Sequence, residues 1–199
     1  MSAGPSMLGC TDPLPRQPSR VLVAGTSGSG KTTLAAHVGR TLGIPHVEID
    51  ALFHGPGWTR RRDFEADVRR FSSRAAWVTE WQYGQVRALL AGRADLLVWL
   101  DLSRLTVMRQ LVIRTLSRRL RREVLWNGNT EPPLRTILTD RDHIVRWGWS
   151  THPQTAVRVA ALARQRPDLP VVRLRSRRAA RRWVEGPLTD AVASFGRSG

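Results

Sequence analysis

Short apolar runs alternate with longer stretches of helical period from Arg20 onward. Each run is apolar at nearly every position, as expected for strands that are buried on both faces of a parallel sheet. The intervening stretches place apolar residues three or four positions apart, which is the spacing of helices that cover such a sheet. The pattern predicts an α/β fold in three layers, with a five-stranded parallel sheet flanked by helices. The predicted strands are Val21–Ala24, His46–Ile49, Trp77–Thr79, Leu96–Leu100 and Val171–Leu174.

The helical stretches carry their own start and stop signals. One helix is predicted to end at Gly43, because glycine commonly terminates helices. Another repeats the helical spacing over residues 64–71. Ser103 is placed to cap a helix that runs to about Arg122. The last predicted helix spans about 140–164, with a kink at its internal proline.

The segment Leu125–Pro133 interrupts this rhythm between the two longest predicted helices. It contains a glycine, a proline pair and both asparagines of the chain, so it is predicted to be a loop. Loops between long helices serve as lids in enzymes that must exclude water, and they also serve as plain connections. Both interpretations stay open, with the lid extending over about 114–135.

The length of 199 residues indicates one domain with an adequate core. Residues 1–19 contain four prolines and no continuous apolar stretch, which favours a flexible N-terminal tail over a secretory signal. The domain is predicted to span 20–185, followed by a C-terminal tail over 186–199. No apolar run reaches the roughly 18 residues of a membrane span. We therefore expect a cytoplasmic protein without a membrane partner.

The strongest motif follows the first predicted strand and opens a helix. It matches the pattern G-x-x-x-x-G-K-[ST] of the P-loop, in which the glycines let successive backbone N–H groups point at phosphate oxygens. Lys31 is placed to reach the β and γ phosphates of ATP, and the Thr32 hydroxyl is a suitable ligand for Mg²⁺. The predicted nucleotide-binding residues are Gly25, Thr26, Ser27, Gly28, Ser29, Gly30, Lys31, Thr32 and Thr33.

The lysine count excludes one class of P-loop protein. Lys31 is the only lysine, so the Asn-Lys-x-Asp sequence that reads guanine does not occur, and a GTPase of that type is excluded. No Leu-Ser-Gly-Gly-Gln segment supports an ABC-type ATPase, and the chain lacks the length for the helical lid of a typical AAA+ module.

Three acids follow predicted strands at the sheet edge where ligands bind in open parallel sheets. Asp50, Glu80 and Asp101 are therefore candidates for the phosphate side of the site. Asp101 ends an apolar run that resembles a Walker B strand, whose acid holds Mg²⁺, and Glu80 is its rival for the metal. Asp50 is predicted to orient or deprotonate an acceptor hydroxyl. Each acid is also consistent with a helix cap or a solvated loop.

Aromatic residues surround two of these acids. Phe53 and Trp58 follow Asp50, and Trp81 and Tyr83 follow Glu80. Such rings suit stacking on a base or a sugar, and they suit core packing equally well.

Arginines share one face of the helix that precedes the predicted lid. Arg114, Arg118 and Arg121 or Arg122 lie at helical spacing, with Leu116, Leu120 and Val112 predicted as the opposite, buried stripe. Guanidinium groups at this place would stabilise the charge of a transferring phosphoryl group. A solvated basic face remains the alternative.

The formal net charge is +16, from 32 Lys+Arg against 16 Asp+Glu. Because only one of the 32 is lysine, 31 are arginine. A large basic excess indicates nucleic-acid binding. It is also typical of a GC-rich genome, which the two asparagines support, so a nucleic-acid partner is possible but not favoured.

Several of the sequence blocks described above, which are named at the end of this paragraph, together resemble a known family, the adenylate-kinase-related proteins often labelled topology modulation proteins. The resemblance covers roughly Arg20 to Val184. Members usually show Asp-Gly-Asn-Tyr after the third strand, where this chain has Glu80-Trp81-Gln82-Tyr83, so the acceptor contact of the asparagine is in doubt. The blocks that carry the resemblance are the P-loop, Glu48–Phe53, Pro56–Trp58, Trp77–Tyr83 and the arginine helix that leads to Gly128, Asn129 and Glu131.

The resemblance implies an adenylate-kinase-like fold with a small arginine-rich lid and an acceptor region after the second strand. It names no substrate. The resulting hypothesis is an ATP- and Mg²⁺-dependent phosphotransferase that acts on a small acceptor, either a nucleoside monophosphate or a hydroxyl metabolite. The alternative is a nucleotide-dependent regulatory or DNA-associated protein. The predicted catalytic residues are Lys31, Asp50, Arg114 and Arg118, and the predicted metal ligands are Thr32 with Asp101 or Glu80.

Overall fold

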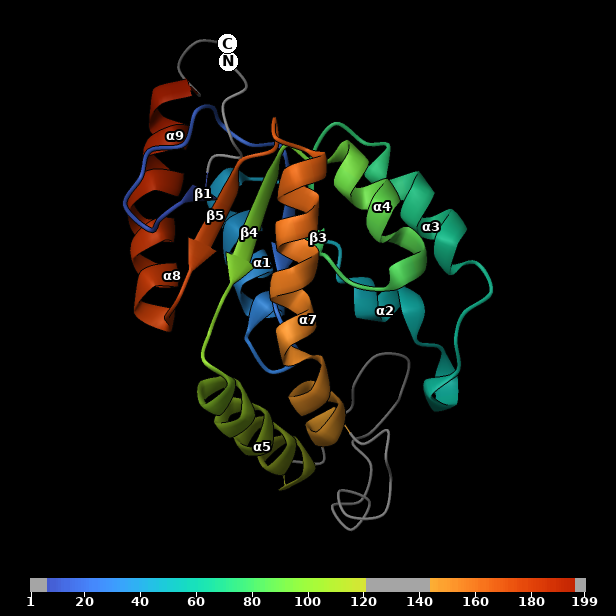
Figure 1. The fold of residues 1–199 in the computed structure, drawn as a ribbon. Coiled ribbons are helices and arrows are strands. Elements are labelled where there is room, and N and C mark those ends of the chain that lie inside the picture. Colours follow the sequence, from blue (N-terminus) through green and yellow to red (C-terminus); the bar gives the residue numbers. More distant parts are fainter. Residues whose placement is uncertain (1–6, 121–143, 196–199) are drawn as a thin grey trace.

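A computed structural model describes residues 7–120 and 144–195. It confirms the predicted fold class: five parallel strands form one sheet in the order β1-β5-β4-β2-β3, with helices on both faces (Figure 1). Because the strands are parallel, the connections from β2 to β3, from β3 to β4 and from β4 to β5 are crossovers that carry helices, whereas residues 9–19 join β1 to β2 without one. The strands are β1 (Met7–Leu8), β2 (Arg20–Ala24), β3 (Trp77–Glu80), β4 (Leu96–Leu100) and β5 (Val171–Leu174).

One predicted strand was wrong. His46 forms only an isolated bridge with Val78, and the segment then turns into helix α2 (Ile49–Phe53). The pairing stops because the Ile49 N–H donates to the Glu80 carboxylate, which holds the backbone at the start of the helix. The apolar run that suggested a strand is therefore a single pairing position followed by a helical turn.

The fifth strand comes from the N-terminal segment. Met7 and Leu8 pair in parallel with Val171 and Val172 of β5, and Leu14 is buried. The prediction of a flexible tail over 1–19 was thus wrong for residues 7–19. A two-residue strand gives no periodicity, and prolines dominate the segment around it.

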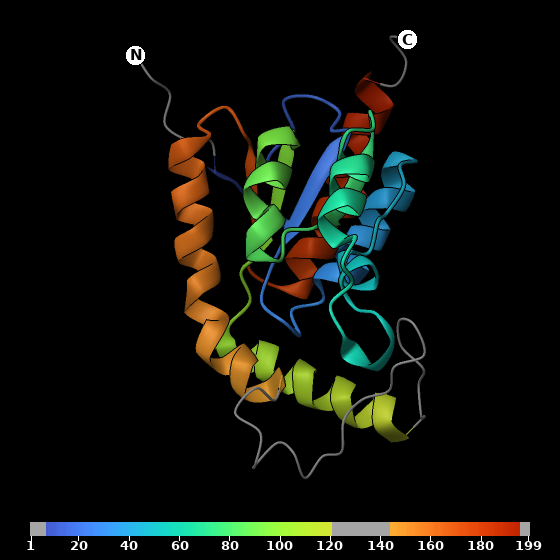
Figure 2. The same ribbon diagram turned by 90° about the vertical axis from the view of Figure 1, so that its right-hand side faces the viewer.

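Helices cover both faces of the sheet (Figures 1 and 2). One core layer packs α3, α4 and α7 against side chains such as Leu22 and Leu97. The other packs α1, α8 and α9 against the alternate positions, such as Val23 and Val98. The bounds are α1 (Lys31–Leu42), the short 3₁₀ helix η1 (Pro56–Trp58), α3 (Phe64–Ser72), α4 (Gly84–Arg93), α5 (Arg104–Leu120), α7 (Ile144–Gln165), α8 (Arg177–Trp183) and α9 (Thr189–Phe195).

The C-terminal residues also belong to the core. A π-helical turn, η3 (Val184–Leu188), connects α8 to α9, and Leu188 and Ala191 are buried against the sheet. The predicted tail over 186–199 is therefore helical as far as Phe195.

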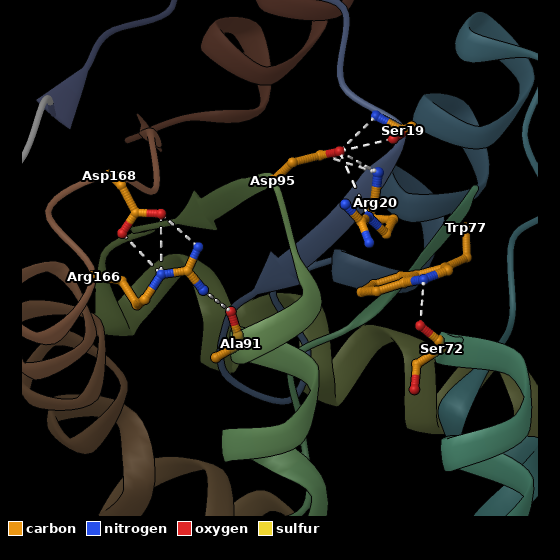
Figure 3. A network of polar contacts seen from close by, with 8 residues as sticks. All are labelled: Ser19, Arg20, Ser72, Trp77, Ala91, Asp95, Arg166 and Asp168. Atoms are coloured by element: carbon orange, nitrogen blue, oxygen red, sulfur yellow. Dashed lines mark hydrogen bonds and ion pairs between the residues drawn. The ribbon is translucent and has the colours of Figure 1, made fainter. Parts of the chain in front are cut away.

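A polar network closes the sheet edge at which the strands begin (Figure 3). Asp95, just before β4, accepts hydrogen bonds from the Ser19 N–H (3.1 Å), the Ser19 hydroxyl (2.8 Å) and the Arg20 N–H (3.0 Å). Beyond the end of α7, Arg166 donates to Asp168 and to the Ala91 carbonyl (2.7 Å), which ties α7 to α4. Asp95 and Arg166 thus tie neighbouring segments together at this edge.

Helix α5 lies beyond the opposite edge, where the strands end (Figure 1). Among the described side chains of α5, Val107 and Leu111 are buried, whereas Val112, predicted as buried, is 40% exposed. Leu125–Pro133 and most of the predicted lid lie outside the described residues. In the described part of the chain, no helix has the length and apolar character of a membrane span.

Candidate active site at the carboxyl edge of the sheet

The P-loop lies between β2 and α1, at the carboxyl edge of the sheet. Two of its glycines adopt left-handed backbone conformations, Gly28 with φ of 84° and Gly30 with φ of 89°, which other residues adopt only with strain. Gly28 also lies against Leu111 of α5, where a Cβ would stand 2.8 Å from the leucine Cβ. Both the turn and its contact with α5 therefore require glycine.

The P-loop contains a buried hydroxyl without a partner. Ser29 is 3% exposed, and its Oγ makes no hydrogen bond with the described residues. A Cβ at Gly25 would collide with this same oxygen, so the glycine leaves it space. Buried polar groups are nearly always paired, and an orphaned one at a helix start fits a ligand that accepts hydrogen bonds, as a phosphate does.

Lys31 begins α1 and is buried. Burial lowers its pKa, whereas the nearby carboxylates of Asp50 and Glu80 raise it. The charge of Arg114 on α5 acts on the same ammonium and lowers its pKa. The structure thus brings four sequence-predicted site residues within electrostatic reach of one another, although they come from four different segments of the chain.

Glu80 ends β3 and is almost completely buried, at 1% exposure. Burial alone would raise the pKa of its carboxyl. Hydrogen bonds from His46 Nε2 and from the Ile49 N–H, each 3.1 Å, outweigh burial and lower that pKa. Glu80 is therefore an ionised carboxylate at neutral pH, held in one orientation beside Lys31.

Asp101 has a different environment at the end of β4. Its Oδ2 accepts two hydrogen bonds from Arg173 of β5, at 2.8 Å from Nε and 2.5 Å from Nη2. The Arg173 guanidinium also lies over the Trp99 ring, 4.7 Å from its centroid. The two candidate metal acids are thus distinct: Glu80 lies near the P-loop lysine, and Asp101 is bound in an ion pair that cross-strand register creates.

Asp50 lies in the first turn of α2 and is fixed by residues that follow β3. Its Oδ1 accepts hydrogen bonds from Gln82 Nε2 and from the Tyr83 hydroxyl (2.6 Å). The same hydroxyl lies 3.2 Å from His54 Nε2. Gln82 and His54 were not predicted as site residues; the sequence signal for Gln82 was that it replaces an asparagine that is usual in the family that the sequence resembles.

Tyr83 keeps its proton in this network. Burial raises its phenol pKa, and the charge of Asp50 raises it further, so the hydroxyl is a donor across the physiological range. Its ring stacks on Phe53 at 3.9 Å and meets Phe64 edge-on at 5.3 Å. The aromatic residues predicted near Asp50 thus serve partly as core and partly as the support of a carboxylate.

Trp58 is the aromatic residue most open to solvent near Asp50. It is 37% exposed, and its ring meets His54 edge-on at 5.1 Å. Its backbone φ of 60° is uncommon for a non-glycine residue. An exposed ring beside the Asp50 network is available for contact with a ligand.

Of the predicted arginine face, Arg114 is placed near Lys31. The side chain of Arg118, and Arg121 and Arg122, lie outside the described part of the structure. Thr32 follows Lys31 in α1 and is half-buried, and Thr33 is exposed.

Comparison with solved structures supports the fold alone. A gluconokinase from Sinorhizobium meliloti 1021 superposes with a TM-score of 0.52 at 20% identity, over 92% of this chain and 99% of that one. A shikimate kinase from Bacteroides thetaiotaomicron aligns with a TM-score of 0.44 at 16% identity, over 84% and 95% of the two chains. No family model matches the chain, and no curated protein matches it. The superposition on the gluconokinase shows that the two chains share a fold.

Proposed function

We propose that this protein is an ATP- and Mg²⁺-dependent phosphotransferase that acts on a small acceptor. One observation carries the proposal: the P-loop lysine, Lys31, lies within electrostatic reach of the carboxylates of Asp50 and Glu80 and of the Arg114 guanidinium. Phosphoryl transfer needs this set of groups, because it depends on positioning and on charge neutralisation around the transferred group.

The nucleotide would lie on residues 25–33. The backbone N–H groups of the loop and the free Ser29 hydroxyl offer hydrogen bonds to phosphate oxygens, and Lys31 supplies positive charge. Thr32 would hold Mg²⁺ together with Glu80, with Asp101 as the other candidate. The bound ion supplies neutralisation of the phosphate charge. We favour Glu80 for this place because its carboxylate acts electrostatically on Lys31, although both of its oxygens also accept hydrogen bonds.

Asp50 is the proposed acceptor residue. Its described hydrogen bonds fall on Oδ1, from Gln82 and Tyr83. Oδ2 is thereby left to a substrate hydroxyl, which it would orient or deprotonate. If the acceptor is a nucleoside monophosphate instead, its own phosphate is the nucleophile and arginines would bind it. Arg114 and Arg118 are proposed to stabilise the transferring phosphoryl group.

Membership of the topology modulation family stays a prediction from the sequence blocks. The fold is compatible with it, and the departure at Glu80-Trp81-Gln82-Tyr83 now has a physical description, since Gln82 binds Asp50. Among the described residues, the feature in favour of a DNA-associated role is a set of exposed arginines, such as Arg177 and Arg178 of α8 and Arg69 and Arg70 of α3.

The proposal is tested by ADP formation from ATP across a panel of nucleoside monophosphates, nucleosides and small hydroxyl metabolites. At least one acceptor should raise turnover well above slow hydrolysis, and Lys31→Ala should reduce that rate by at least about 100-fold. Arg40→Ala is the matched control, because Arg40 is an exposed cation on the same helix. The absence of any acceptor effect contradicts the proposal.

A further inference from the structure

His54 ends the short helix that carries Asp50. Helix α2 has five residues, and the His54 N–H caps it by donating to the Asp50 carbonyl at 3.0 Å. Residues four positions apart lie on the same face of a helix, so the two side chains project from one side of α2. A single helical turn is not stable by itself in water, so the orientation of Asp50 depends on the contacts made around α2.

The side chains of Asp50 and His54 meet at the hydroxyl of Tyr83. This hydroxyl donates to Asp50 Oδ1 at 2.6 Å, and its oxygen lies 3.2 Å from His54 Nε2. Burial and the charge of Asp50 raise the pKa of Tyr83, so the hydroxyl keeps its proton. Because this one proton goes to the carboxylate, the oxygen is an acceptor on the side of His54, where an Nε2 that carries a proton would donate to it.

The imidazole of His54 has a fixed place in the fold. Its ring meets Phe53 edge-on at 5.0 Å between centroids and Trp58 edge-on at 5.1 Å. The loop that carries Trp58 is closed by the Arg61 N–H, which donates to the Phe53 carbonyl at 2.9 Å. The contact with Tyr83 is therefore part of a packed arrangement and not a chance approach of a surface side chain.

The charges around His54 also connect it to Asp50. Burial lowers the pKa of His54, and the charge of Asp50 raises it. The two arginines that follow this loop bind other acids, Arg60 with Glu65 at 2.9 Å and Arg61 with Asp67 at 3.1 Å. The His54 ring is thus coupled to Asp50 through the backbone, through the Tyr83 hydroxyl and through charge.

We propose that His54 is a positioning residue, which holds the Tyr83 hydroxyl proton on Asp50 Oδ1 so that Oδ2 faces the acceptor hydroxyl. The inference rests on the proposed function and adds a residue that acts on the reaction through two others. A phenol hydroxyl rotates about its C–O bond, and a donor on one side of the oxygen excludes the rotations that turn the proton away from the carboxylate. Both described hydrogen bonds to the Asp50 carboxylate fall on Oδ1, which agrees with this role.

The first test compares two replacements of the imidazole. His54→Leu removes the hydrogen bond, whereas His54→Gln keeps an N–H donor at a similar reach. The KM for a hydroxyl acceptor should rise about three-fold in His54→Leu and stay within about two-fold of wild type in His54→Gln, with the KM for ATP within about two-fold in both. His37→Leu is the matched control, because His37 is an exposed histidine of α1, and it should behave as the wild type.

The outcomes of this comparison separate a hydrogen bond from ring packing. A His54→Leu variant with the wild-type KM for the acceptor overturns the inference, and so does a His54→Gln variant as impaired as His54→Leu. In a Tyr83→Phe background no hydroxyl remains, so His54→Leu should have no further effect on that KM. An effect of His54→Leu that persists in full in this background also overturns the inference.

The second test needs no turnover, because Tyr83 is the only tyrosine of the chain. Tyrosine labelled with ¹³C at Cζ gives one NMR signal, whose position responds to the hydrogen bonds of the hydroxyl. Because His54→Leu and His54→Gln both lack the aromatic ring, a difference between their signals reports the hydrogen bond to residue 54. We expect the two signals to differ, and coincident signals would overturn the inference.

The two tests distinguish the inference from the function on which it rests. If an acceptor is phosphorylated and its KM does not change in His54→Leu, the inference fails and the kinase proposal stands. If no acceptor is phosphorylated, the kinase proposal fails and the Cζ signal decides the inference. Distinct signals in the two variants then support the contact of His54 with Tyr83, and coincident signals overturn it.

Discussion

The two edges of the sheet differ in how their polar groups are paired, although the acids at the carboxyl edge, Asp50, Glu80 and Asp101, also accept hydrogen bonds. At the edge where the strands begin, Asp95 receives hydrogen bonds from Ser19 and Arg20, and Arg166 binds Asp168. At the edge where they end, Ser29 Oγ is buried without a described partner, and Lys31 is desolvated near like-charged Arg114. The first edge stabilises the fold, whereas the second holds groups that cost free energy until a ligand binds.

Backbone strain follows the same division. The left-handed φ values of non-glycine residues in the described chain occur at Trp58 and Tyr83, both beside the Asp50 network. Such conformations cost of order 1–3 kcal/mol and persist where surrounding contacts enforce them. The stacking of Tyr83 on Phe53 and its hydrogen bond to Asp50 hold Tyr83 in this conformation. The carboxyl edge is thus organised for placement of side chains rather than for minimum energy.

The largest expected effect is on catalysis, from Asp50→Asn. The amide keeps the shape of the carboxylate but cannot take a proton, so kcat with the best hydroxyl acceptor should fall by about 100-fold. Steady-state kinetics measure this fall in kcat. Asp63→Asn, an exposed acid before α3, is the control and should keep wild-type kcat. Equal kcat values for the two variants would remove Asp50 from the reaction.

The opposite edge should respond in stability and not in catalysis. Asp95→Ala removes the acceptor of the Ser19 and Arg20 hydrogen bonds and leaves two backbone N–H groups without it. We expect the free energy of unfolding in urea to fall by about 2–3 kcal/mol, with kcat within two-fold of wild type.

Asp168→Ala is the control for Asp95→Ala. Asp168 is 65% exposed in its pair with Arg166, so its loss should cost less than about 1 kcal/mol. An Asp95→Ala variant as stable as Asp168→Ala would contradict the structural role of this edge.

A smaller effect is expected from Tyr83→Phe. The ring keeps its stack on Phe53, while the hydroxyl that binds Asp50 and His54 is lost. Loss of one buried hydrogen bond of about 1 kcal/mol should raise the acceptor KM about five-fold. The effect should vanish in an Asp50→Asn background, because the two groups act together. Additive effects in the double variant would show that the hydroxyl acts elsewhere.

The smallest expected effect is a pH dependence from His54. Burial lowers its pKa below the usual 6.5, so the native state favours the neutral ring. The unfolded chain therefore binds the proton on His54 more readily than the native state does. The contribution of His54 to the free energy of unfolding is complete above pH 6.5 and is lost as the pH falls through the lower native pKa. Melting temperatures from pH 8 to pH 5 should fall less in His54→Gln than in wild type. Parallel plots of melting temperature against pH for the two proteins would show that His54 does not cause the pH dependence.

Much of the fold could be predicted from sequence because buried parallel strands are continuous apolar runs. Val21–Ala24 and Leu96–Leu100 are such runs, and both pair as expected. Residues 46–49 show the limit: His46 makes a single bridge with Val78, and helix α2 begins at Ile49, whose N–H donates to Glu80, a residue distant in sequence. Strand β1 gave no signal, since its two residues depend on β5 for their conformation.

The candidate site could be predicted by residue type but not by partner. Asp50, Glu80 and Asp101 were alike as acids that follow apolar runs. What separates Asp101 is an ion pair with Arg173, which depends on the register of β4 against β5. Long-range pairing of this kind leaves no local pattern, so the sequence alone could not rank the metal candidates.

The central claim is that the carboxyl edge transfers the γ-phosphoryl group of ATP to a small acceptor. The most direct measurement follows that group, with [γ-³²P]ATP, Mg²⁺ and the acceptor that gives the fastest ADP formation. The account predicts that the label appears on the organic product in the wild type and in Arg40→Ala, and not in Lys31→Ala. Label that appears only as inorganic phosphate, at a rate independent of acceptor and of Lys31, would contradict it.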